Sequence, residues 1–579
     1  MDDTTPTLRI APLGGLGEVG MNMMVYESGD SLIVVDAGTL FPENSLLGID
    51  LIIPDMAYLE EKRAALKAVF ITHSHEDHVG ALPYLLKRFP VPIYASRFAA
   101  AYIRHKLKEH GLRDAQVLEL EAGKAVQAGD FNVLPVEVTH SVADTFSFAI
   151  RCAAGTVVHT GDFKIDLTPS DRSRFDFHTF ASLGRQGVDL LLMDSTNSME
   201  RGHAASEREV ARGFDSIFND HEGRIIVTLF SSSIPRIISL LALARRHKRK
   251  VAVEGRSLRN NLDIAVKLGY LKRDDSLFIE PQELDAHPSH KLLVLVSGSQ
   301  GESRSALTRI AHEEHPHIVI REGDLVVFSA RQIPGNERSI DSIINKLSLL
   351  GAKVYSSRSG RMIHASGHAY REELRTMLQL VRPRHFIPIH GEPHHLISNL
   401  RLAQEMGVPR ADSLLLQDGE TAELSSMGLA RGEAVRSGRI YVDGVGVGDV
   451  EDPVIRDRKK LAQTGVLMVV LSLNRELAIV SGPEFIQRGV TSEPVMEDIL
   501  IEAEKVVRDI IDDFSRKDVV RRQELNEELR IRVRRIFNRR FKRKPVVVPV
   551  LLWDEPDETP GRSEDLVPLA DDDLPEEED

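Results

Sequence analysis

The sequence predicts an α/β protein of several domains, and three observations support this fold class. The chain has 579 residues, which is more than one hydrophobic core usually holds. Short apolar segments typical of strands alternate with segments that carry apolar residues at helical spacing. A composition of 42% hydrophobic and 28% charged residues is typical of globular proteins. We therefore expect sheets layered with helices.

Two α/β domains are expected before residue 430, one of them inserted into the other. The first begins at 1–205, with predicted strands at 32–35, 68–72, 92–95, 131–138, 156–159 and 190–193. The second is expected at 206–355, where helical segments separate strands at 225–229, 251–253, 292–296 and 325–328, as in a parallel sheet. Histidine-bearing segments then return, so 356–430 is expected to complete the first domain.

A linker, a small domain and a tail are expected in the rest of the chain. Every second residue of 443–448 is glycine, which favours a flexible connection, and we place a linker at 431–460. A C-terminal α/β domain is expected at 461–553, with strands at 466–473, 476–480 and 546–552 and helices at 493–515 and 518–541. Residues 554–579 are acidic, contain several prolines and are expected to be disordered.

Several bulk features predict a cytoplasmic protein with no membrane partner. No run of about 18 apolar residues is present, and the start of the chain lacks the features of a signal peptide. The single cysteine, Cys152, excludes an internal disulfide and is expected in a buried strand.

The net charge of −14 does not exclude a nucleic-acid partner, because the acidic residues are unevenly distributed. The tail holds thirteen acidic residues and one arginine, which leaves the rest of the chain near neutral. Lys and Arg gather at 245–250 and 516–544. Such runs are usually solvated helix faces, and nucleic-acid binding is the functional alternative.

The motif His73-x-His75-x-Asp77-His78 places four metal-capable side chains within six residues. It follows the predicted strand at 68–72 and precedes apolar residues at helical spacing in 79–89, so it lies on a strand-to-helix loop. Imidazole and carboxylate ligands suit zinc, with manganese as the alternative. A polar solvated loop with chance histidines is the alternative interpretation.

Three later strand ends supply further ligand types, namely His140, Asp162 and His390. Each alone is more often a cap or turn residue. Their recurrence favours a site at the carboxyl ends of strands. We expect one ion on His73, His75 and His140 and a second on Asp77, His78 and His390, with Asp162 bridging. Asp36 is expected to orient a histidine ligand.

A glycine-rich segment, Gly15-Leu16-Gly17-Glu18-Val19-Gly20, matches the dinucleotide-binding pattern G-x-G-x-x-G. However, residues 21–26 have strand character, so no helix follows to present its N-terminus to a pyrophosphate. We expect a tight turn beside the metal site instead.

Three other segments could bind a phosphate. One contains His364, Ala365, Ser366, Gly367 and His368, and another contains Ser231, Ser232 and Ser233 after a predicted strand. A helix cap is the alternative for the serines. The segment 297–302 has the same ambiguity.

Together these residues, with Asp194 in Met193-Asp194-Ser195-Thr196-Asn197, resemble the metallo-β-lactamase superfamily and, within it, the β-CASP nucleases. The resemblance covers nearly the whole chain. It implies an αββα sandwich with an inserted β-CASP domain and a small C-terminal α/β domain. The acidic tail is outside the family pattern.

The resemblance also implies an activity and roles for particular residues. It implies a two-metal ribonuclease that removes nucleotides from RNA 5′ ends, prefers a 5′-monophosphate and also cuts internally. His368 resembles the general acid, oriented by Asp194, and Asp77 belongs to the catalytic set. The serines at 231–233 and the segment 364–368 resemble a phosphate pocket.

Further implications concern ions and assembly. Asp50 and Asp443 resemble a peripheral cation site, for which calcium is the candidate. A homodimer or homotetramer involving the C-terminal domain is implied, and RNA-decay proteins are possible partners.

Three rival functions remain open. A hydrolase of small esters, thioesters or lactams would not need the phosphate-like segments of an inserted domain. A DNA-directed nuclease would share every motif, because recognition of a 2′-hydroxyl is not visible in a sequence. A non-catalytic scaffold in an RNA-decay assembly is disfavoured by the complete ligand set.

Overall fold

A computed structural model of the chain describes residues 5–42, 46–171, 173–272, 274–333, 335–444, 446–448, 452–517 and 521–553. The chain divides into two compact units, which are described separately. The first comprises Met1–Phe41 and Leu51–Ile440, and the second comprises Pro42–Asp50 and Tyr441–Asp579. Among the described helices, none is long and apolar enough to cross a membrane. The acidic tail lies outside the described residues.

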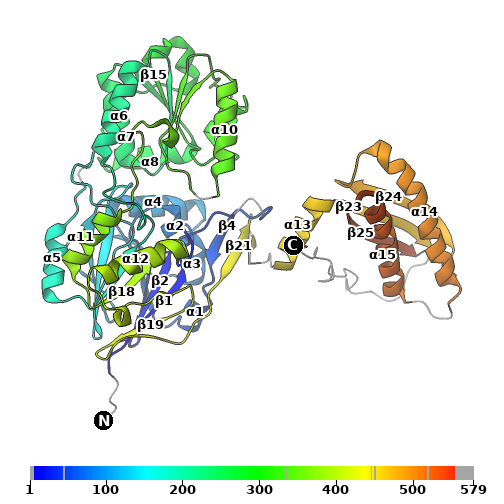
Figure 1. Cartoon of the computed structure of the whole chain (residues 1–579), viewed down its shortest axis with the longest axis horizontal. Helices are drawn as coiled ribbons and strands as arrows, with labels where there is room; N and C mark the ends of the chain where they lie inside the picture. The colour runs from blue at the N-terminus through cyan, green and yellow to red at the C-terminus, as the bar shows by residue number, and fades with distance from the viewer. Residues whose placement is uncertain are drawn as a thin grey trace. The chain divides into compact units, whose positions relative to one another are not determined.

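Two sheets packed face to face form the base of the first unit (Figure 1). The eight-stranded sheet has the order β20 (Gly428–Arg431), β19 (Ala422–Ser425), β1 (Leu8–Gly14), β2 (Met23–Ser28), β3 (Ser31–Val35), β5 (Leu66–Phe70), β6 (Ile93–Ala95) and β7 (Val117–Glu119). The six-stranded sheet has the order β18 (His385–Ile389), β12 (Leu190–Asp194), β11 (Gly155–His159), β10 (Thr145–Cys152), β9 (Phe131–Val138) and β8 (Val126–Ala128).

Apolar side chains fill the space between the two sheets. Phe70 from the first sheet meets Phe148 from the second with ring centroids 5.8 Å apart, in one buried cluster that also holds Ile33 and Leu192. Helices α5 (Phe177–Gln186), α11 (Arg371–Val381) and α12 (Pro393–Glu405) bury apolar residues against the other face of the second sheet. On the first sheet, α4 (Arg97–Glu109) contacts β6 and β7. The expected αββα sandwich is confirmed.

The inserted domain lies at one end of the sandwich and has its own parallel sheet (Figure 1). The strand order is β14 (Lys250–Glu254), β15 (Leu292–Val296), β13 (Ile225–Thr228), β16 (Leu325–Phe328) and β17 (Lys353–Tyr355). Alternate residues of β13 point to opposite faces. Val227 joins a cluster with α6 (Glu207–Asp220), α7 (Ile234–Arg246) and α8 (Arg256–Lys267), whereas Ile226 joins one with α9 (Ala306–Ala311) and α10 (Glu337–Leu349). The expected parallel sheet is confirmed.

After the insertion the chain returns to the second sheet. Strand β18 pairs in parallel with β12, with Leu190 opposite His385 and Asp194 opposite Ile389. Residues separated by almost two hundred positions therefore become neighbours. The pairing brings the strand ends that carry Asp194 and His390 to one edge.

The glycine-rich segment forms a turn and is followed by strand β2, as expected. Gly15, Gly17 and Gly20 have φ angles of 94°, 91° and 131°, which favour glycine. The amide of Gly17 donates to the carbonyl of Gly391, at 3.0 Å, directly after His390. The turn therefore lies beside the predicted metal site.

The loop after β5 carries two short helices where one segment at 79–89 was expected. They are α2 (Glu76–Val79) and α3 (Leu82–Arg88). Pro83 has no amide hydrogen to donate to the carbonyl of Val79, so the first helix ends and a second begins. Two other short elements of the unit are β4 (Leu51–Pro54) and α1 (Ala57–Glu61).

The second unit contains a three-stranded sheet with two helices on one face. Its strand order is β24 (Ile479–Arg488), β23 (Val466–Leu473) and β25 (Val546–Trp553). Helices α14 (Glu493–Ser515) and α15 (Arg522–Phe541) share a buried cluster with Leu467, Val469 and Leu471. Helix α13 (Asp452–Thr464) precedes the sheet.

Three sequence expectations for this unit need correction. Strand β24 begins at Ile479 instead of residue 476, because the Asn474 side chain accepts from the amides of Glu476 and Ala478 and fixes a turn. Helix α15 begins at Arg522, and residues 518–520 lie outside the described part. The expected linker contains two short strands, β21 (Arg439–Asp443) and β22 (Gly446–Val447). They pair in antiparallel register, with Val442 opposite Val447 and Asp443 opposite Gly446.

Candidate metal centre

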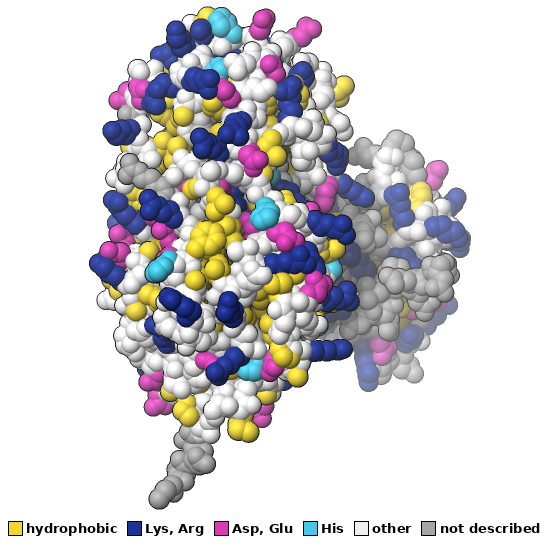
Figure 2. Space-filling view, turned by 60° about the vertical axis from the view of Figure 1, so that its left-hand side comes forward, with side chains coloured by type: hydrophobic (Ala, Val, Ile, Leu, Met, Phe, Trp, Pro, Cys, Tyr) yellow, Lys and Arg dark blue, Asp and Glu magenta, His cyan; other side chains and the backbone are white. Residues whose placement is uncertain are grey.

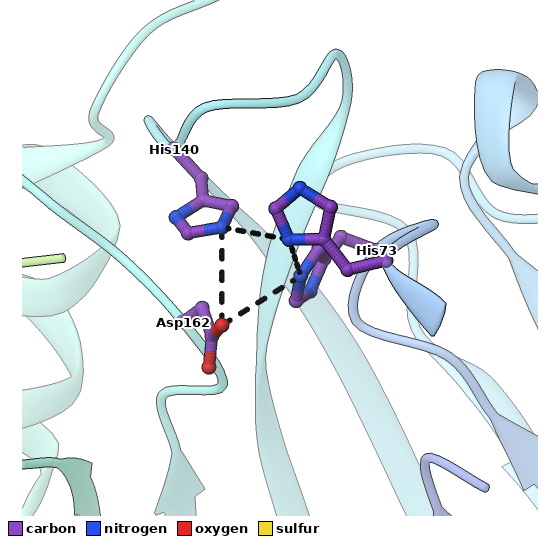
Figure 3. Close-up of side chains that lie close together, drawn as sticks. His73, His140 and Asp162 are labelled. Carbon is purple, nitrogen blue, oxygen red and sulfur yellow. Dashed lines mark hydrogen bonds and ion pairs between the residues drawn. The ribbon is translucent and has the colours of Figure 1, made fainter. Parts of the chain in front are cut away.

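The predicted ligands meet at the carboxyl ends of the strands of the sandwich. Strand β5 leads into the histidine loop, and His140, Asp162 and His390 follow β9, β11 and β18. Side chains of His73, His140 and Asp162 point toward one another (Figure 3). The seven ligands predicted for the two-metal site fall into two groups that share Asp162.

The first group contains His73, His75, His140 and Asp162. Nε2 of His73 lies 3.0 Å from Nδ1 of His75, which lies 3.3 Å from Nε2 of His140. Oδ2 of Asp162 is 3.7 Å from the His73 nitrogen and 3.8 Å from the His140 nitrogen. Nitrogens bound at about 2.0–2.1 Å to a tetrahedral zinc ion lie about 3.3 Å apart, so this donor set fits the ion.

The second group contains Asp77, His78, Asp162 and His390. Nε2 of His78 lies 3.5 Å from Oδ2 of Asp77 and 3.3 Å from Oδ2 of Asp162. Nε2 of His390 is 3.6 Å from Oδ2 of Asp77 and is buried without a hydrogen-bond partner. A buried unpaired nitrogen facing a carboxylate also fits a bound cation.

Outer hydrogen bonds orient the histidine rings. Oδ2 of Asp36 accepts from Nδ1 of His78 at 2.7 Å, and Oδ1 accepts from the amide of Thr72 at 2.8 Å. The carbonyl of Gly367 lies 2.7 Å from Nδ1 of His140, and only a protonated Nδ1 can donate to it. In the neutral His140 ring Nε2 is therefore left with a lone pair that faces the cluster. The geometry of Asp36 agrees with the orienting role expected for it.

Two backbone positions at the site are constrained. Asp36 has a φ angle of 64°, an uncommon conformation for a residue other than glycine. At Gly367 a Cβ atom would lie 2.6 Å from Cε1 of His140. The segment that contains Gly367 must therefore keep a glycine to approach this histidine.

Burial and neighbouring charges set the protonation of the cluster. Burial holds the pKa of His73 and of His140 well below the usual value and lowers that of His75 to about 4. These rings are neutral at physiological pH, as ligands must be. Burial also acts against protonation of His78, but the carboxylates of Asp162 and Asp77 outweigh it and raise its pKa.

The predicted general acid lies beside the two groups. Nδ1 of His368 is 2.8 Å from Oδ2 of Asp194 and 3.9 Å from Oδ2 of Asp162. Oδ1 of Asp194 accepts from the amide and hydroxyl of Thr196, at 2.9 and 2.8 Å, which fixes the carboxylate. Burial lowers the pKa of His368, but Asp194 and Asp162 outweigh it and raise it to about 9. The structure therefore brings His368 and Asp194 together as expected.

The two serine-containing segments are connected through a buried arginine. Ser233 precedes helix α7, and its side chain makes no capping hydrogen bond. Arg236 in the same helix donates to the carbonyl of Ile363 at 3.4 Å, next to His364. Burial lowers the pKa of His364 to about 3, and its Nδ1 is buried without a partner. This nitrogen is a candidate for contact with a ligand.

Asp50 and Asp443, the expected peripheral cation ligands, belong to the second unit. Oδ2 of Asp50 accepts from the amide of Gly444 at 2.8 Å, and Oδ2 of Asp443 pairs with Arg458 at 2.6 Å. Neither carboxylate is in a group of three or more metal-capable side chains among the described residues. Their geometry adds no support to a calcium site.

Sequence reasoning missed residues that support the site. Thr72 contacts Asp36, and Asn197 contacts Ser366, whereas Arg236 and Glu207 form a buried pair nearby. Asn197 and Thr72 are within three residues of predicted site residues, and this proximity was the only available signal. For the buried pair the sequence offers no signal, because the partners are 29 residues apart.

Family models match most of the chain. The metallo-beta-lactamase superfamily matches residues 16–187, and the ribonuclease J beta-CASP domain matches 222–347. A Zn-dependent metallo-hydrolase RNA specificity domain matches 359–410, and the ribonuclease J C-terminal domain matches 453–552. These matches follow the order of the domains in the structure.

Relatives cover nearly the whole chain. Ribonuclease J of Thermus thermophilus is 38% identical over 94% of this chain and 95% of its own length. Ribonuclease J2 of Bacillus subtilis is 36% identical over 95% and 99%, and ribonuclease J of Helicobacter pylori is 36% identical over 94% and 79%.

A solved structure from Enterococcus faecalis, a protein of unknown function, shares the fold alone. It has a TM-score of 0.51 and 17% identity, and the match covers 72% of this chain and 99% of that one. The motif order, the family models and the long relatives all agree with the resemblance found in the sequence. The chain belongs to the ribonuclease J family, the metal-dependent ribonucleases of the metallo-β-lactamase fold with an inserted β-CASP domain.

Proposed function

We propose that this chain removes nucleotides from RNA 5′ ends with two metal ions, prefers a 5′-monophosphate, and also cuts RNA internally. One observation carries the proposal. Two buried groups of metal-capable side chains share Asp162 and adjoin the His368–Asp194 pair. This arrangement suits hydrolysis of a phosphodiester without a protein nucleophile.

Zinc is the proposed ion, with manganese as the alternative. The two groups together offer five imidazoles and two carboxylates. Imidazole nitrogens favour zinc or manganese, whereas calcium and magnesium prefer oxygen ligands. Two such ions would ionise a water molecule and neutralise charge that develops on the phosphate. The protein side chains hold the ligand geometry through Asp36, Thr72 and the Gly367 carbonyl.

His368 is proposed to protonate the leaving oxygen. Its Nδ1 contacts the Asp194 carboxylate, so Nε2 remains to carry the transferred proton. The neighbouring carboxylates raise the pKa of His368, so the ring stays protonated at neutral pH. Asp194 holds the orientation of the ring because Thr196 fixes its other oxygen.

The segment 364–368 and the serines at 231–233 are proposed to bind the terminal phosphate. Ser366 is 9% exposed, and the unpaired Nδ1 of His364 lies in the same segment. Such a pocket close to His368 would place the first phosphodiester bond at the metal centre. An enzyme built this way would measure its cut from the 5′ end.

RNA is the proposed substrate for two reasons. An RNA specificity domain matches residues 359–410, and the named relatives are ribonucleases. Figure 2 shows Lys and Arg side chains spread over this face of the first unit, which suits a polyanion. A hydrolase of small esters would not need the inserted domain. A DNA-directed nuclease and a non-catalytic scaffold are the remaining alternatives.

The test compares matched RNA and DNA strands, with and without prior chelation of metal. We expect cleavage of 5′-labelled RNA to release mononucleotides, to stop after chelation and to return with added zinc or manganese. Cleavage of DNA alone would support the DNA-directed alternative. No cleavage of either polymer in metal-replete buffer would support the scaffold.

The phosphate pocket has its own test, Ser366→Ala. We expect the ratio of kcat/KM for 5′-monophosphate over 5′-hydroxyl RNA to fall about tenfold, as for loss of one hydrogen bond to a charged group. Thr376→Ala, a change in helix α11, is the matched control, because its hydroxyl bonds a carbonyl of its own helix. An unchanged ratio in Ser366→Ala would refute the pocket.

A homodimer or homotetramer involving the C-terminal domain is also proposed. The sheet face away from α14 and α15 exposes Met468, Ile486 and Val548, which are cross-strand neighbours, to between 37% and 45%. An exposed apolar row of this kind is typical of an interface. The proposed occupant is a second copy of this chain.

We expect Met468→Lys to lower the sedimentation coefficient from that of an assembly toward that of a monomer. Met427→Lys, at a residue 91% exposed in the first unit, is the control that leaves the assembly intact. If both variants sediment like the wild type, this face is not the interface.

Other parts of the proposal rest on the family alone. They are cytoplasmic location, roles in rRNA maturation and mRNA decay, association with RNA-decay proteins, and a peripheral calcium ion at Asp50 and Asp443.

A further inference from the structure

A side chain from the inserted domain reaches the metal-binding domain beside the predicted phosphate pocket. Arg331 lies in the loop after β16. Its Nη1 donates to Oδ1 of Asn197 at 2.9 Å, and its Nη2 donates to Oε1 of Glu200 at 2.9 Å. Both acceptors belong to the loop that follows β12 and Asp194. Arg331 therefore links the two domains of the first unit near His368.

The Asn197 amide is oriented by this contact. A guanidinium can only donate, so the oxygen of the amide must face Arg331. The amide nitrogen then donates to Oγ of Ser366 at 2.7 Å and to the carbonyl of His368 at 3.2 Å. Asn197 is 4% exposed, so water does not compete for these bonds.

The hydrogen bonds of Ser366 determine where its proton can point. A hydroxyl has two acceptor lone pairs and one donor. Oγ of Ser366 accepts from Nδ2 of Asn197 and from the amide of His368, at 2.7 and 3.2 Å. Both lone pairs are in use, and the hydroxyl hydrogen is left to donate to another acceptor. A phosphate oxygen accepts such a bond.

The loop that carries Arg331 is itself held in the inserted domain. Nε2 of Gln300 donates to the carbonyl of Arg331 at 2.8 Å, and Oε1 of Gln300 accepts from the amide of Ile333 at 2.9 Å. Gln300 is 6% exposed. The position of the guanidinium therefore follows the position of the inserted domain.

We propose that Arg331 and Asn197 are positioning residues for 5′-end specificity. Arg331 fixes the Asn197 amide, the amide fills a lone pair of Ser366, and the Ser366 proton is thereby directed to the terminal phosphate. Arg331 of the inserted domain thus influences recognition of the 5′ end without itself touching the terminal phosphate. This inference rests on the proposed preference for 5′-monophosphate RNA.

Two variants of the full-length enzyme test this chain of hydrogen bonds from Arg331 through Asn197 to Ser366, which we call the relay. Arg331→Gln removes the guanidinium that donates to both Asn197 and Glu200. Asn197→Asp keeps the contact with Arg331 but replaces the donor to Ser366 with an acceptor, so the serine proton turns toward residue 197. We expect each variant to lower the 5′-monophosphate to 5′-hydroxyl ratio of kcat/KM about tenfold. Arg358→Gln is the matched control, because Arg358 is an exposed arginine paired with Asp341 of the inserted domain.

A variant with a general structural defect would lose activity equally on both RNA substrates, whereas loss of the relay would lower only the ratio between them. Equal loss of rate on 5′-monophosphate and 5′-hydroxyl RNA, with the ratio unchanged, would overturn the relay. In a Ser366→Ala background the two variants are expected to leave the ratio unaltered, because the acceptor of the relay is gone. A further tenfold fall in that background would also contradict it, since the effect would then bypass Ser366.

The wild-type enzyme separates this inference from the proposed function. If it shows no preference for a 5′-monophosphate, the proposed end specificity fails. If it shows the preference and Arg331→Gln retains it, the relay alone fails.

Discussion

Two buried polar clusters lie in the first unit, and they differ in how completely their atoms are paired. In the metal centre, histidine nitrogens face one another and carboxylate oxygens, and Nε2 of His390 has no partner. At the domain junction, Arg236 donates to both oxygens of Glu207, at 2.6 and 2.7 Å, and to Oγ of Ser329 at 2.7 Å. The first arrangement requires a ligand to neutralise it, whereas the second is complete without one.

The completeness of pairing distinguishes a cluster suited to binding a ligand from one that stabilises the fold. Burial lowers the pKa of three histidines in the metal centre, so they remain uncharged and available as ligands. At the junction, burial also acts on Glu207, but Arg236 outweighs it and lowers the pKa of that carboxyl. The completed charge pair lies within the inserted domain and stabilises it, whereas the incomplete cluster is suited to binding ions.

The largest effect is expected for His75→Ala. Loss of this ligand is expected to reduce RNA hydrolysis by about 10³-fold or more, because a bound cation supplies several kcal/mol of transition-state stabilisation. The unfolding midpoint of the metal-free protein should change little. His178→Ala, an exposed histidine of α5, is the control for both measurements. Retained turnover in metal-replete buffer would count against the site.

Glu207→Gln is expected to destabilise the fold. Removing one partner of a buried charge pair costs about 3–5 kcal/mol, because Arg236 is left uncompensated. Chemical denaturation measures the change, and Arg358→Gln at an exposed pair should cost less than about 1 kcal/mol. Metal content per folded chain should not change. Equal, small effects for both variants would remove the contrast between the clusters.

Asp36→Asn is expected to have the smallest of the three effects. The carboxylate orients His78 from outside the ligand set, and loss of such a partner weakens metal binding about 10–100-fold. Competition with a chelator measures the affinity. Asp341→Asn, at an exposed carboxylate, is the matched control. An affinity equal to that of the wild type would leave Asp36 with a structural role only.

The sequence was sufficient for the metal centre because its signals are local. His73 to His78 lie in one loop, and His140, Asp162 and His390 each follow a strand by a few residues. Strand periodicity located those ends, and parallel pairing placed them together. The same reasoning gave the parallel sheet of the insertion, whereas the αββα sandwich was implied by the resemblance to the metallo-β-lactamase superfamily.

Contacts between distant segments were not predictable. Arg331 meets Asn197 across 134 positions, and Asn197 meets Ser366 across 169. No periodicity or spacing encodes such pairs. The start of β24 was missed because an Asn474 turn overrides strand propensity in 474–478. The pairing of β21 with β22 was missed because alternating glycines resemble a flexible segment.

The parallel pairing of β12 with β18 has a consequence for synthesis of the protein. The ribosome must complete the whole insertion before β18 can join the second sheet, and His390 follows that strand. Until then the second ligand group lacks a member. A nascent chain that ends before His390 therefore cannot assemble the complete second ligand group.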